Sequence, residues 1–524
     1  MRDLQLPGRS PVFAMNGMCA TSHPLAAKVA VQMLEAGGNA VDAAIAGAAL
    51  LEICEPMMTG IGGDCFALIA PPEGDVIAVN GSGRAPAGLS AEALRGEGLS
   101  SIPANHAVAV TIPGAIDAFC RMAKEWGTRS IADLFAPAIH YAEAGVPVSQ
   151  RTGADWAQVS DLGNKARDIF LKDGAAYRIG EVFRRPGIAE VMRRVALDGR
   201  EAFYEGEIAE DMVATLRAMG GIHTMEDFAA TACDIGTPVS THYSGHDVLE
   251  HRPNGQGATA LLLLNILSHF DIGDLDPYGV ERAHIEAEAT KLAYDARNRF
   301  VADPDHMARL EHMIAPETAE KLAGLIRKDR ALPIDLPGAE NAHKDTVYIT
   351  VVDRNRMKVS LIYSIFHSFG SGIASDKFGI LFQNRGCGFT LEEGHANEAG
   401  PGKRPMHTII PGMLASGGKV VMPFGVMGGQ YQANGHARLL TNMLDFGMDP
   451  QEAIDGPRSF PEAGGALTVE RGYADDVRQG LADLGHEVRF PDTPIGGAQA
   501  IRVNAENVLE AGSDPRKDGC ALGY

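Results

Sequence analysis

The sequence predicts an α+β protein, because helical and extended patterns both occur along its 524 residues. An alanine-rich stretch from Asn39 to about Ile53 is typical of a buried helix that packs closely against its neighbours. In contrast, β-branched and aromatic residues dominate 346–353 and 359–363, which predicts two strands on either side of the turn 354–356. No repeat of about 20–50 residues divides the chain, so one globular unit is expected.

The other elements follow from hydrophobic spacing and from residues that begin or end helices. Ser22 can cap a first helix, whose apolar residues recur every four positions from Leu25 onward. Gly37-Gly38 ends that helix, and Asn39 can cap the next one. In chain order, the remaining expected elements are a strand over 66–70, a mostly helical region over about 131–228, helices over 258–268 and 284–299, and a strand over 420–424.

Charge and composition exclude several classes of partner. The chain has 67 Asp and Glu against 46 Lys and Arg, and its net charge of -21 argues against nucleic acid or an anionic membrane. Its seven cysteines form no C-x-x-C pair, which indicates a reducing compartment. The N-terminus lacks the apolar segment of a secretory signal, and no run approaches the roughly 20 apolar residues of a membrane span. A cytoplasmic protein is therefore expected.

Sequence motifs for cofactors and metals do not occur in the chain. Gly60-Ile61-Gly62-Gly63 follows a helix and a proline turn rather than a strand, and it lacks the G-x-G-x-x-G spacing of a dinucleotide site. A tight backbone turn is the better interpretation. No Walker motif, H-E-x-x-H motif or zinc-spaced cluster of His and Cys is found. The sequence therefore predicts neither a cofactor nor a metal.

Thr346 is the first candidate for a catalytic residue. It opens a predicted strand and follows the polar stretch 336–344, which is a candidate for an exposed processing loop. Self-cleavage after Asp345 would give Thr346 a free α-amine with a pKa of roughly 7.7–8.0, which can act as general base for its own hydroxyl. The alternative is a structural threonine, since β-branched residues are common in strands. The local pattern alone favours the structural role.

Motifs along the chain resemble the gamma-glutamyltranspeptidase family. They are largely glycine-anchored, occur in the order of the family and extend from Gly37 to Arg516, so the resemblance covers nearly the whole chain. The matching segments are Gly37-Gly38-Asn39-Ala40-Val41-Asp42-Ala43-Ala44, Glu55-Pro56, Gly60-Ile61-Gly62-Gly63-Asp64, His284-Ile285-Glu286-Ala287-Glu288-Ala289, Lys291-Leu292-Ala293-Tyr294, Arg297, Phe369-Gly370-Ser371-Gly372-Ile373, Gly379-Ile380-Leu381, Gly402-Lys403-Arg404-Pro405, Gly428-Gly429 and Ser513-Asp514-Pro515-Arg516.

The resemblance implies an N-terminal-nucleophile hydrolase with a four-layer αββα sandwich. In that family, the threonine that matches Thr346 is the nucleophile of a self-processed enzyme acting on amides. The precursor is then expected to cut itself between Asp345 and Thr346 by an N→O acyl shift. The products would be a large subunit, residues 1–345, and a small subunit, residues 346–524. They are expected to stay associated, because in the resembled fold both contribute strands to a shared core.

The resemblance also implies roles for four further residues. Gly428 and Gly429 match the pair that forms the oxyanion hole, although a glycine pair after a strand is otherwise a simple turn. Ser364 matches a hydroxyl residue that hydrogen-bonds the nucleophile. Arg84 matches the arginine that grips the substrate α-carboxylate through two parallel hydrogen bonds. The alternatives are a structural strand serine and a surface arginine after a glycine loop.

Five positions depart from the transpeptidase pattern. Thr408 and His407 stand where the transpeptidases carry two serines that hold the glutamyl carboxylate. Thr408 keeps a hydroxyl, whereas His407 either binds substrate or is a structural histidine with satisfied partners. Phe366, Arg385 and Gly388 replace the Asn, Gln and Asp that hold the glutamyl α-amino and α-carboxyl groups. Arg385 would repel a substrate ammonium and attract a carboxylate.

The departures favour the amidohydrolase and acylase branches of the family, such as oxamate amidohydrolases and cephalosporin-acylase-like members. The predicted activity is hydrolysis of an amide bond in a small carboxylate-bearing substrate through an acyl-Thr346 intermediate. A gamma-glutamyltransferase or glutathione hydrolase is the alternative. A self-cleaving but inactive scaffold is a third interpretation, against which Thr346, Arg84 and the glycine pair together weigh. The acceptor, water or an amine, and the oligomeric state, a homo-oligomer included, stay open.

Overall fold

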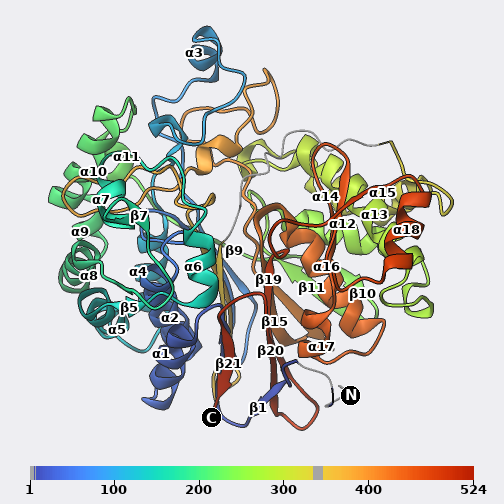
Figure 1. Cartoon of the computed structure of the whole chain (residues 1–524). Coiled ribbons are helices and arrows are strands. Elements are labelled where there is room, and N and C mark those ends of the chain that lie inside the picture. Colours follow the sequence, from blue (N-terminus) through green and yellow to red (C-terminus); the bar gives the residue numbers. More distant parts are fainter. Residues whose placement is uncertain (1–4, 6–7, 334–345) are drawn as a thin grey trace.

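Two seven-stranded β-sheets stack face to face at the centre of the molecule (Figure 1). The computed structural model describes residue 5, residues 8–333 and residues 346–524. In spatial order, the β12 sheet consists of β21 (Cys520–Gly523), β2 (Met18–Thr21), β12 (Val347–Val352), β13 (Lys358–Ser364), β3 (Asp64–Ala70), β4 (Ile77–Gly81) and β9 (Asp234–Gly236). The β15 sheet consists of β1 (Val12–Ala14), β20 (Leu509–Ser513), β19 (Gly497–Val503), β15 (Lys419–Met427), β14 (Gly412–Ser416), β11 (His246–Glu250) and β10 (Val239–Tyr243).

Helices cover the outer face of each sheet, on the left and right flanks of Figure 1. The β12 sheet is covered by α1 (Pro24–Glu35), α2 (Ala40–Cys54), α4 (Ala115–Trp126), α5 (Ile131–Ala144) and α8 (Pro186–Asp198). The β15 sheet is covered by α12 (Gly257–Leu267), α13 (Val280–Phe300), α16 (Gln432–Leu444) and α17 (Pro450–Asp455). This order of layers confirms the predicted αββα sandwich and the α+β class.

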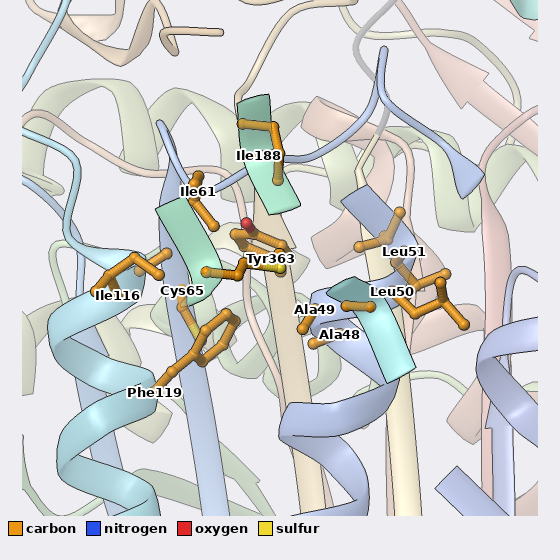
Figure 2. Close-up of a cluster of buried hydrophobic side chains, with 14 of the residues drawn as sticks. Ala48, Ala49, Leu50, Leu51, Ile61, Cys65, Ile116, Phe119, Ile188 and Tyr363 are labelled. Atoms are coloured by element: carbon orange, nitrogen blue, oxygen red, sulfur yellow. The ribbon is translucent and has the colours of Figure 1, made fainter. Parts of the chain in front are cut away.

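The core between the β12 sheet and its helices holds β13, the strand next to Thr346, in position. Figure 2 shows the ring of Tyr363, from β13, among side chains of α2 and α4. Its ring centroid lies 5.2 Å from that of Phe119, in an edge-to-face arrangement that favours aromatic pairs. Tyr363 is fully buried, so its main chain is held by packing on one face and by strand pairing on both sides.

Segments from before and after the predicted cleavage site both contribute strands to each sheet. Strand β12 pairs with β2 on one side and with β13 on the other. In the β15 sheet, β20 pairs with the N-terminal β1, and β14 pairs with β11. The two parts of the chain therefore share one pair of sheets rather than forming separate domains.

The start of the first helix differs from the prediction. His23, not Ser22, caps α1: its Nδ1 accepts a hydrogen bond from Leu25 N at 3.2 Å. Pro24 occupies the first helical position, where its missing N–H costs nothing. Ser22 is instead used by a tertiary contact, since its hydroxyl donates to Glu55. The Asn39 cap of α2 is confirmed, and the Asn39 N–H donates in return to Asp42 Oδ2 at 2.8 Å, which was not anticipated.

The remaining elements lie mostly outside the two sheets. The predicted helical region over 131–228 is confirmed, with short two-residue strands inserted in it. The smaller helices are α3 (Ala91–Gly96), α6 (Gln150–Trp156), α7 (Asn164–Phe170), α9 (Glu201–Tyr204), α10 (Gly206–Ala218), α11 (Met225–Ala229), α14 (Leu310–Ile314), α15 (Pro316–Ala323) and α18 (Asp475–Asp483). The small strands are β5 (Val146–Pro147), β6 (Leu171–Lys172), β7 (Ala175–Ala176), β8 (Val182–Phe183), β16 (Ser459–Pro461), β17 (Ala466–Val469) and β18 (Glu487–Arg489). Among the described residues, none of the helices has the length and apolar composition of a transmembrane span.

Candidate active site

The two sheets bring the predicted nucleophile and the glycine pair to the same end of the sandwich. Thr346 immediately precedes β12, while Gly428 and Gly429 immediately follow β15. Between the sheets, Tyr348 near the start of β12 packs in one cluster with Met427, the last residue of β15. The start of one strand therefore faces the end of the other, which supports the predicted grouping of these residues.

Thr346 is buried, with 1% of its surface exposed, and is anchored to the neighbouring strand. Its Oγ1 donates a hydrogen bond of 3.1 Å to the carbonyl oxygen of Tyr363. The predicted bond between Ser364 and the nucleophile is not made within the described residues. The Ser364 hydroxyl instead accepts from Phe366 N at 2.9 Å, in a turn where Phe366 has a φ of 78°. The strand carbonyl is within reach of the Thr346 hydroxyl, so it takes the place expected for Ser364. The cleavage partner Asp345 lies outside the described residues.

The glycine pair has a conformation that only glycine adopts readily. Gly428 has a φ of 118° and Gly429 a φ of 56°. A Cβ on Gly428 would lie 2.8 Å from the Cα of Gly496. The Gly428 carbonyl accepts from Tyr431 N at 3.1 Å, in the 3₁₀ turn η5 (Gly429–Tyr431). Since N–H and C=O point in opposite directions across a trans peptide, the Gly429 N–H points away from that turn. A backbone donor fixed in this way is what an oxyanion hole requires.

Asp64, at the start of β3, is the centre of a buried polar network beside this end of the sheet. Its Oδ1 accepts from Gly83 N at 2.7 Å and from Gln383 Nε2 at 2.9 Å, and its Oδ2 lies 2.9 Å from His407 Nε2. Three donors therefore hold this carboxylate in a fixed position. Asp64 belongs to a segment that resembles the family, but no role was predicted for it. The sequence pattern that could have indicated a role is an acidic residue directly after a glycine turn and before an apolar strand.

His407 has the structural role that sequence analysis left open. Both ring nitrogens have partners, because Nε2 contacts Asp64 and Nδ1 accepts from Ile409 N at 3.3 Å. Burial, together with the nearby Arg385 charge, lowers the pKa of His407 to about 3. The ring is therefore neutral, with its proton on Nε2 toward the carboxylate. The same contacts hold His407 in place and leave it no ring atom for a substrate.

Arg385 is fully buried and incompletely paired. Its Nη1 donates to the Thr408 hydroxyl at 3.1 Å, and its guanidinium carbon lies 3.9 Å from the ring centroid of Phe366. Its Nε and Nη2 have no hydrogen-bond partner among the described residues. The nearest carboxylate oxygen, Asp64 Oδ2, is 4.0 Å from Nε. Burial lowers the pKa of Arg385 to about 9, so it still carries its charge at neutral pH. The structure thus brings Arg385 and Thr408, two of the predicted substrate-binding residues, into contact.

Arg84 lies in a different environment from the other predicted residues. Its guanidinium contacts Asp234 and Asp303, each at 3.4 Å, and donates to the Gly402 carbonyl at 3.1 Å. Its side chain is 41% exposed. Arg404, which is buried, contacts the same two aspartates. Its backbone N–H donates to Asp303, and its guanidinium donates to Asp234. Arg84 could bind a substrate carboxylate only by exchanging these partners, and the predicted role stays a prediction.

A cavity of about 370 Å³ opens beside the Arg84 cluster. Its walls include Asn80, Asp234 and Arg252, and Asn80 Nδ2 donates to Asn254 Oδ1 at 2.9 Å. Within the described part of the chain, neither Thr346 nor Arg385 lines this cavity. It therefore adjoins the site at the Arg84 side without containing the predicted nucleophile.

One buried group combines residue types that bind metals, namely His284, Glu288 and His486. Its atoms are used by other contacts: His284 Nδ1 and His486 Nε2 are 2.8 Å apart, a hydrogen-bond distance, and the Lys291 ammonium lies 2.7 Å from Glu288 Oε1. His284 Nε2 contacts the carbonyl of Arg327 at 2.7 Å. An ammonium on the carboxylate and a proton between the rings do not fit a cation site.

Comparisons with known proteins agree with this geometry. The family model described as gamma-glutamyltranspeptidase matches residues 26–524. The chain is 37% identical to a glutathione hydrolase-like YwrD proenzyme of Bacillus subtilis, over 98% of this chain and 99% of the relative. It is 34% identical to an oxamate amidohydrolase proenzyme of Klebsiella pneumoniae, over 97% and 98% respectively. A crystal structure of cephalosporin acylase from Bacillus halodurans is similar with a TM-score of 0.93 and 37% identity, covering 100% of this chain and 99% of that one.

Proposed function

The chain belongs to the gamma-glutamyltranspeptidase family, and we propose that it is a self-processed amidohydrolase with Thr346 as its nucleophile. Cleavage between Asp345 and Thr346 would divide it into a large subunit, residues 1–345, and a small subunit, residues 346–524. The proenzyme names of both curated relatives support a precursor that is cut. The burial of Thr346 at the end of the sandwich, opposite the glycine pair, supports its role.

The chemistry of the proposed reaction needs only an N-terminal threonine and two backbone donors. The Thr346 oxygen attacks the amide carbon while its proton passes to the α-amine of the same residue. The N–H groups of Gly428 and Gly429 stabilise the negative charge on the former carbonyl oxygen. Collapse breaks the C–N bond, the amine gives its proton to the leaving ammonia or amine, and an acyl ester stays on Thr346. Water then loses a proton to the same amine, attacks the ester and releases the carboxylic acid.

The unfilled edge of Arg385 is the observation that carries the proposed substrate class. Its Nε and Nη2 form the side of a guanidinium that a carboxylate spans with two parallel hydrogen bonds. Asp64 lies near this edge but already accepts from three donors. The proposed acyl group therefore carries a second carboxylate, as in a monoamide of a small dicarboxylic acid. Oxamate is the shortest such compound, and an oxamate amidohydrolase is among the relatives.

A γ-glutamyl substrate, the alternative, would bring an ammonium group as well as a carboxylate to this pocket. Asp64 is the carboxylate that Arg385 approaches, and its oxygens are occupied. Gly388 supplies no side chain that could replace it. A buried ammonium beside Arg385 would be repelled by the guanidinium and would compete with it for Asp64, which disfavours γ-glutamyl binding.

The substrate proposal is tested by ammonia release from oxamate, malonamate, succinamate and glutaramate, compared with cleavage of a γ-glutamyl p-nitroanilide. The best monoamide is expected to have the higher kcat/KM. Arg385→Gln is expected to lower that kcat/KM about 10- to 100-fold, because it removes a charge-assisted pair. The matched control is the neutral diamide of the same acid, whose hydrolysis should change little in the variant. Faster cleavage of the γ-glutamyl compound by the wild type would overturn the proposal in favour of a glutathione hydrolase.

A further inference from the structure

A buried arginine without a carboxylate partner lies behind the loop of the glycine pair. Arg297, on α13, is 4% exposed, and its described hydrogen-bond partners are side-chain amides rather than carboxylates. Its Nη1 donates to Gln256 Oε1 at 2.8 Å and also to Gln430 Oε1. Its guanidinium carbon lies 4.4 Å from the ring centroid of Tyr294, whose hydroxyl donates to the Gln430 carbonyl. Burial lowers the pKa of Arg297 to about 10, so the residue stays charged at neutral pH.

Gln256 connects this arginine to both loops of the proposed site. Its Nε2 donates to the Thr408 carbonyl at 2.7 Å and to the Gly429 carbonyl at 3.2 Å. Since an arginine only donates hydrogen bonds, the atom that faces Arg297 must be the amide oxygen, which fixes the orientation of the Gln256 amide. Gln256 is fully buried, and all of its polar side-chain atoms are used.

We infer that Gln256 and Arg297 are positioning residues for the oxyanion loop, defined as Gly428–Gln430. The inference rests on the proposed function, in which this loop donates hydrogen bonds to the tetrahedral intermediate. Neither residue has a described contact with Thr346, so each acts through the loop rather than on the substrate.

The two carbonyls of the glycine pair explain how the positioning works. The Gly428 carbonyl is held by Tyr431 N, and the Gly429 carbonyl is held by Gln256. The peptide planes on both sides of Gly429 are therefore fixed, which sets both of its backbone torsions. Glycine otherwise samples a wide range of conformations, so an unsupported loop would lose alignment of its N–H groups. Preorganised donors are the largest single contribution to stabilising such an intermediate.

The charge of Arg297 also stabilises the tetrahedral intermediate electrostatically. An ion pair would cancel its field, but its described partners are the ring of Tyr294 and three neutral side-chain amides, from Gln256, Gln430 and Asn298. A positive charge in a low-dielectric interior attracts the negative charge that develops near the loop. Arg297 thus favours the intermediate over the uncharged substrate amide.

The test uses the full-length, self-processed enzyme with three variants, Gln256→Glu, Arg297→Met and Arg297→Lys. Gln256→Glu keeps a partner for Arg297 but turns carboxylate oxygens toward the carbonyls of Thr408 and Gly429. Arg299→Lys is the matched control, since Arg299 lies one half-turn further along the same helix and is 67% exposed. The measurements are kcat and KM with oxamate, inhibition by oxalate, and hydrogen–deuterium exchange of the peptide that contains the loop.

In Gln256→Glu and Arg297→Met, kcat is expected to fall about 100-fold, a loss typical of a misaligned oxyanion donor, with the oxalate inhibition constant within about three-fold of wild type. Arg297→Lys should recover part of the loss, and loop exchange should increase in the two impaired variants. Unchanged kcat, or oxalate binding that weakens as much as kcat falls, would overturn the inference. If the wild type hydrolyses no monoamide, the proposed function fails, whereas unchanged loop exchange in the variants rejects the positioning role separately.

Discussion

At the scale of single residues, Thr346 combines a reactive group with a rigid support. Its hydroxyl donates a hydrogen bond to the Tyr363 carbonyl, so the lone pairs of Oγ1 are directed elsewhere. Tyr363 is itself fixed by core packing, as Figure 2 shows. Removing Oγ1 therefore deletes the nucleophile with little effect on the strand, because the ladder of β12 and β13 depends on backbone groups.

Thr346→Ala is expected to yield one uncut chain, since the hydroxyl that starts the N→O acyl shift is missing. Thr346→Ser keeps a hydroxyl and should still be processed. Intact-mass spectrometry distinguishes these outcomes, because wild type and Thr346→Ser should give pieces of roughly 37 and 19 kDa by share of length. Two fragments in Thr346→Ala would rule out Thr346 as the processing nucleophile.

Sequence reasoning identified the residues of the site that differ from the family or carry its chemistry, but not those that support them. Thr346 and Arg385 could be predicted through the resemblance to the family, because Thr346 matches its nucleophile and Arg385 replaces a residue that holds the glutamyl group. The roles of Asp64 and Gln256 were not predicted, because they depend on partners more than 150 positions away. Ser364 was assigned a bond that a nearer backbone carbonyl takes instead.

At the scale of elements, the end of β15 carries the most specific geometry of the site. The strand was predicted over 420–424 and extends over Lys419–Met427, directly up to Gly428. Long helices such as α12 and α13 were found within a few residues. Strands such as β19, Gly497–Val503, were missed because small and polar residues interrupt their apolar pattern, although burial on both faces makes them central in the structure.

Gly428→Ala is expected to lower kcat/KM by about 100-fold, because the added methyl group meets Gly496 and displaces an oxyanion donor. The control is Gly417→Ala, in the hairpin before the same strand, where φ is 56° and a Cβ has open space. That change costs about 1–2 kcal/mol of backbone strain and should leave turnover nearly unchanged. Steady-state kinetics and thermal unfolding of both variants distinguish the loss of an oxyanion donor from a loss of stability. Equal loss of activity would mean that only stability had been affected.

At the scale of the whole molecule, the interleaved sheets explain how a cut chain can stay together. Five strand pairings join the parts before and after residue 345, namely β21–β2, β2–β12, β13–β3, β1–β20 and β11–β14. Separating the proposed subunits would break all five ladders and expose both apolar layers. This architecture also places many ionisable groups in a dry interior, which links folding to pH.

The buried histidines are expected to make the folded protein sensitive to acid. Burial lowers the pKa of five of the described histidines, including His223; the pKa falls to about 4 for His23 and His251 and to about 3 for His407 and His486. Below an unfolded pKa of 6.5, the unfolded chain takes up protons that the folded chain does not, so this contribution to stability falls as pH decreases. Glu52 and Glu55 act in the opposite sense, because burial raises their pKa to about 7 and the folded chain retains their protons.

His407→Gln isolates one of these contributions. A glutamine amide can donate to Asp64 as His407 Nε2 does, but it does not titrate. On lowering the pH from about 7.5 to about 5, the wild type should lose about 2 kcal/mol more stability than this variant, the value for one histidine kept neutral below its unfolded pKa. Denaturant unfolding at both pH values measures the difference, with His242→Gln, at an exposed position, as control. Equal pH dependence in wild type and His407→Gln would show that His407 gains a proton in the folded state, and would remove the neutral ring from the network around Asp64.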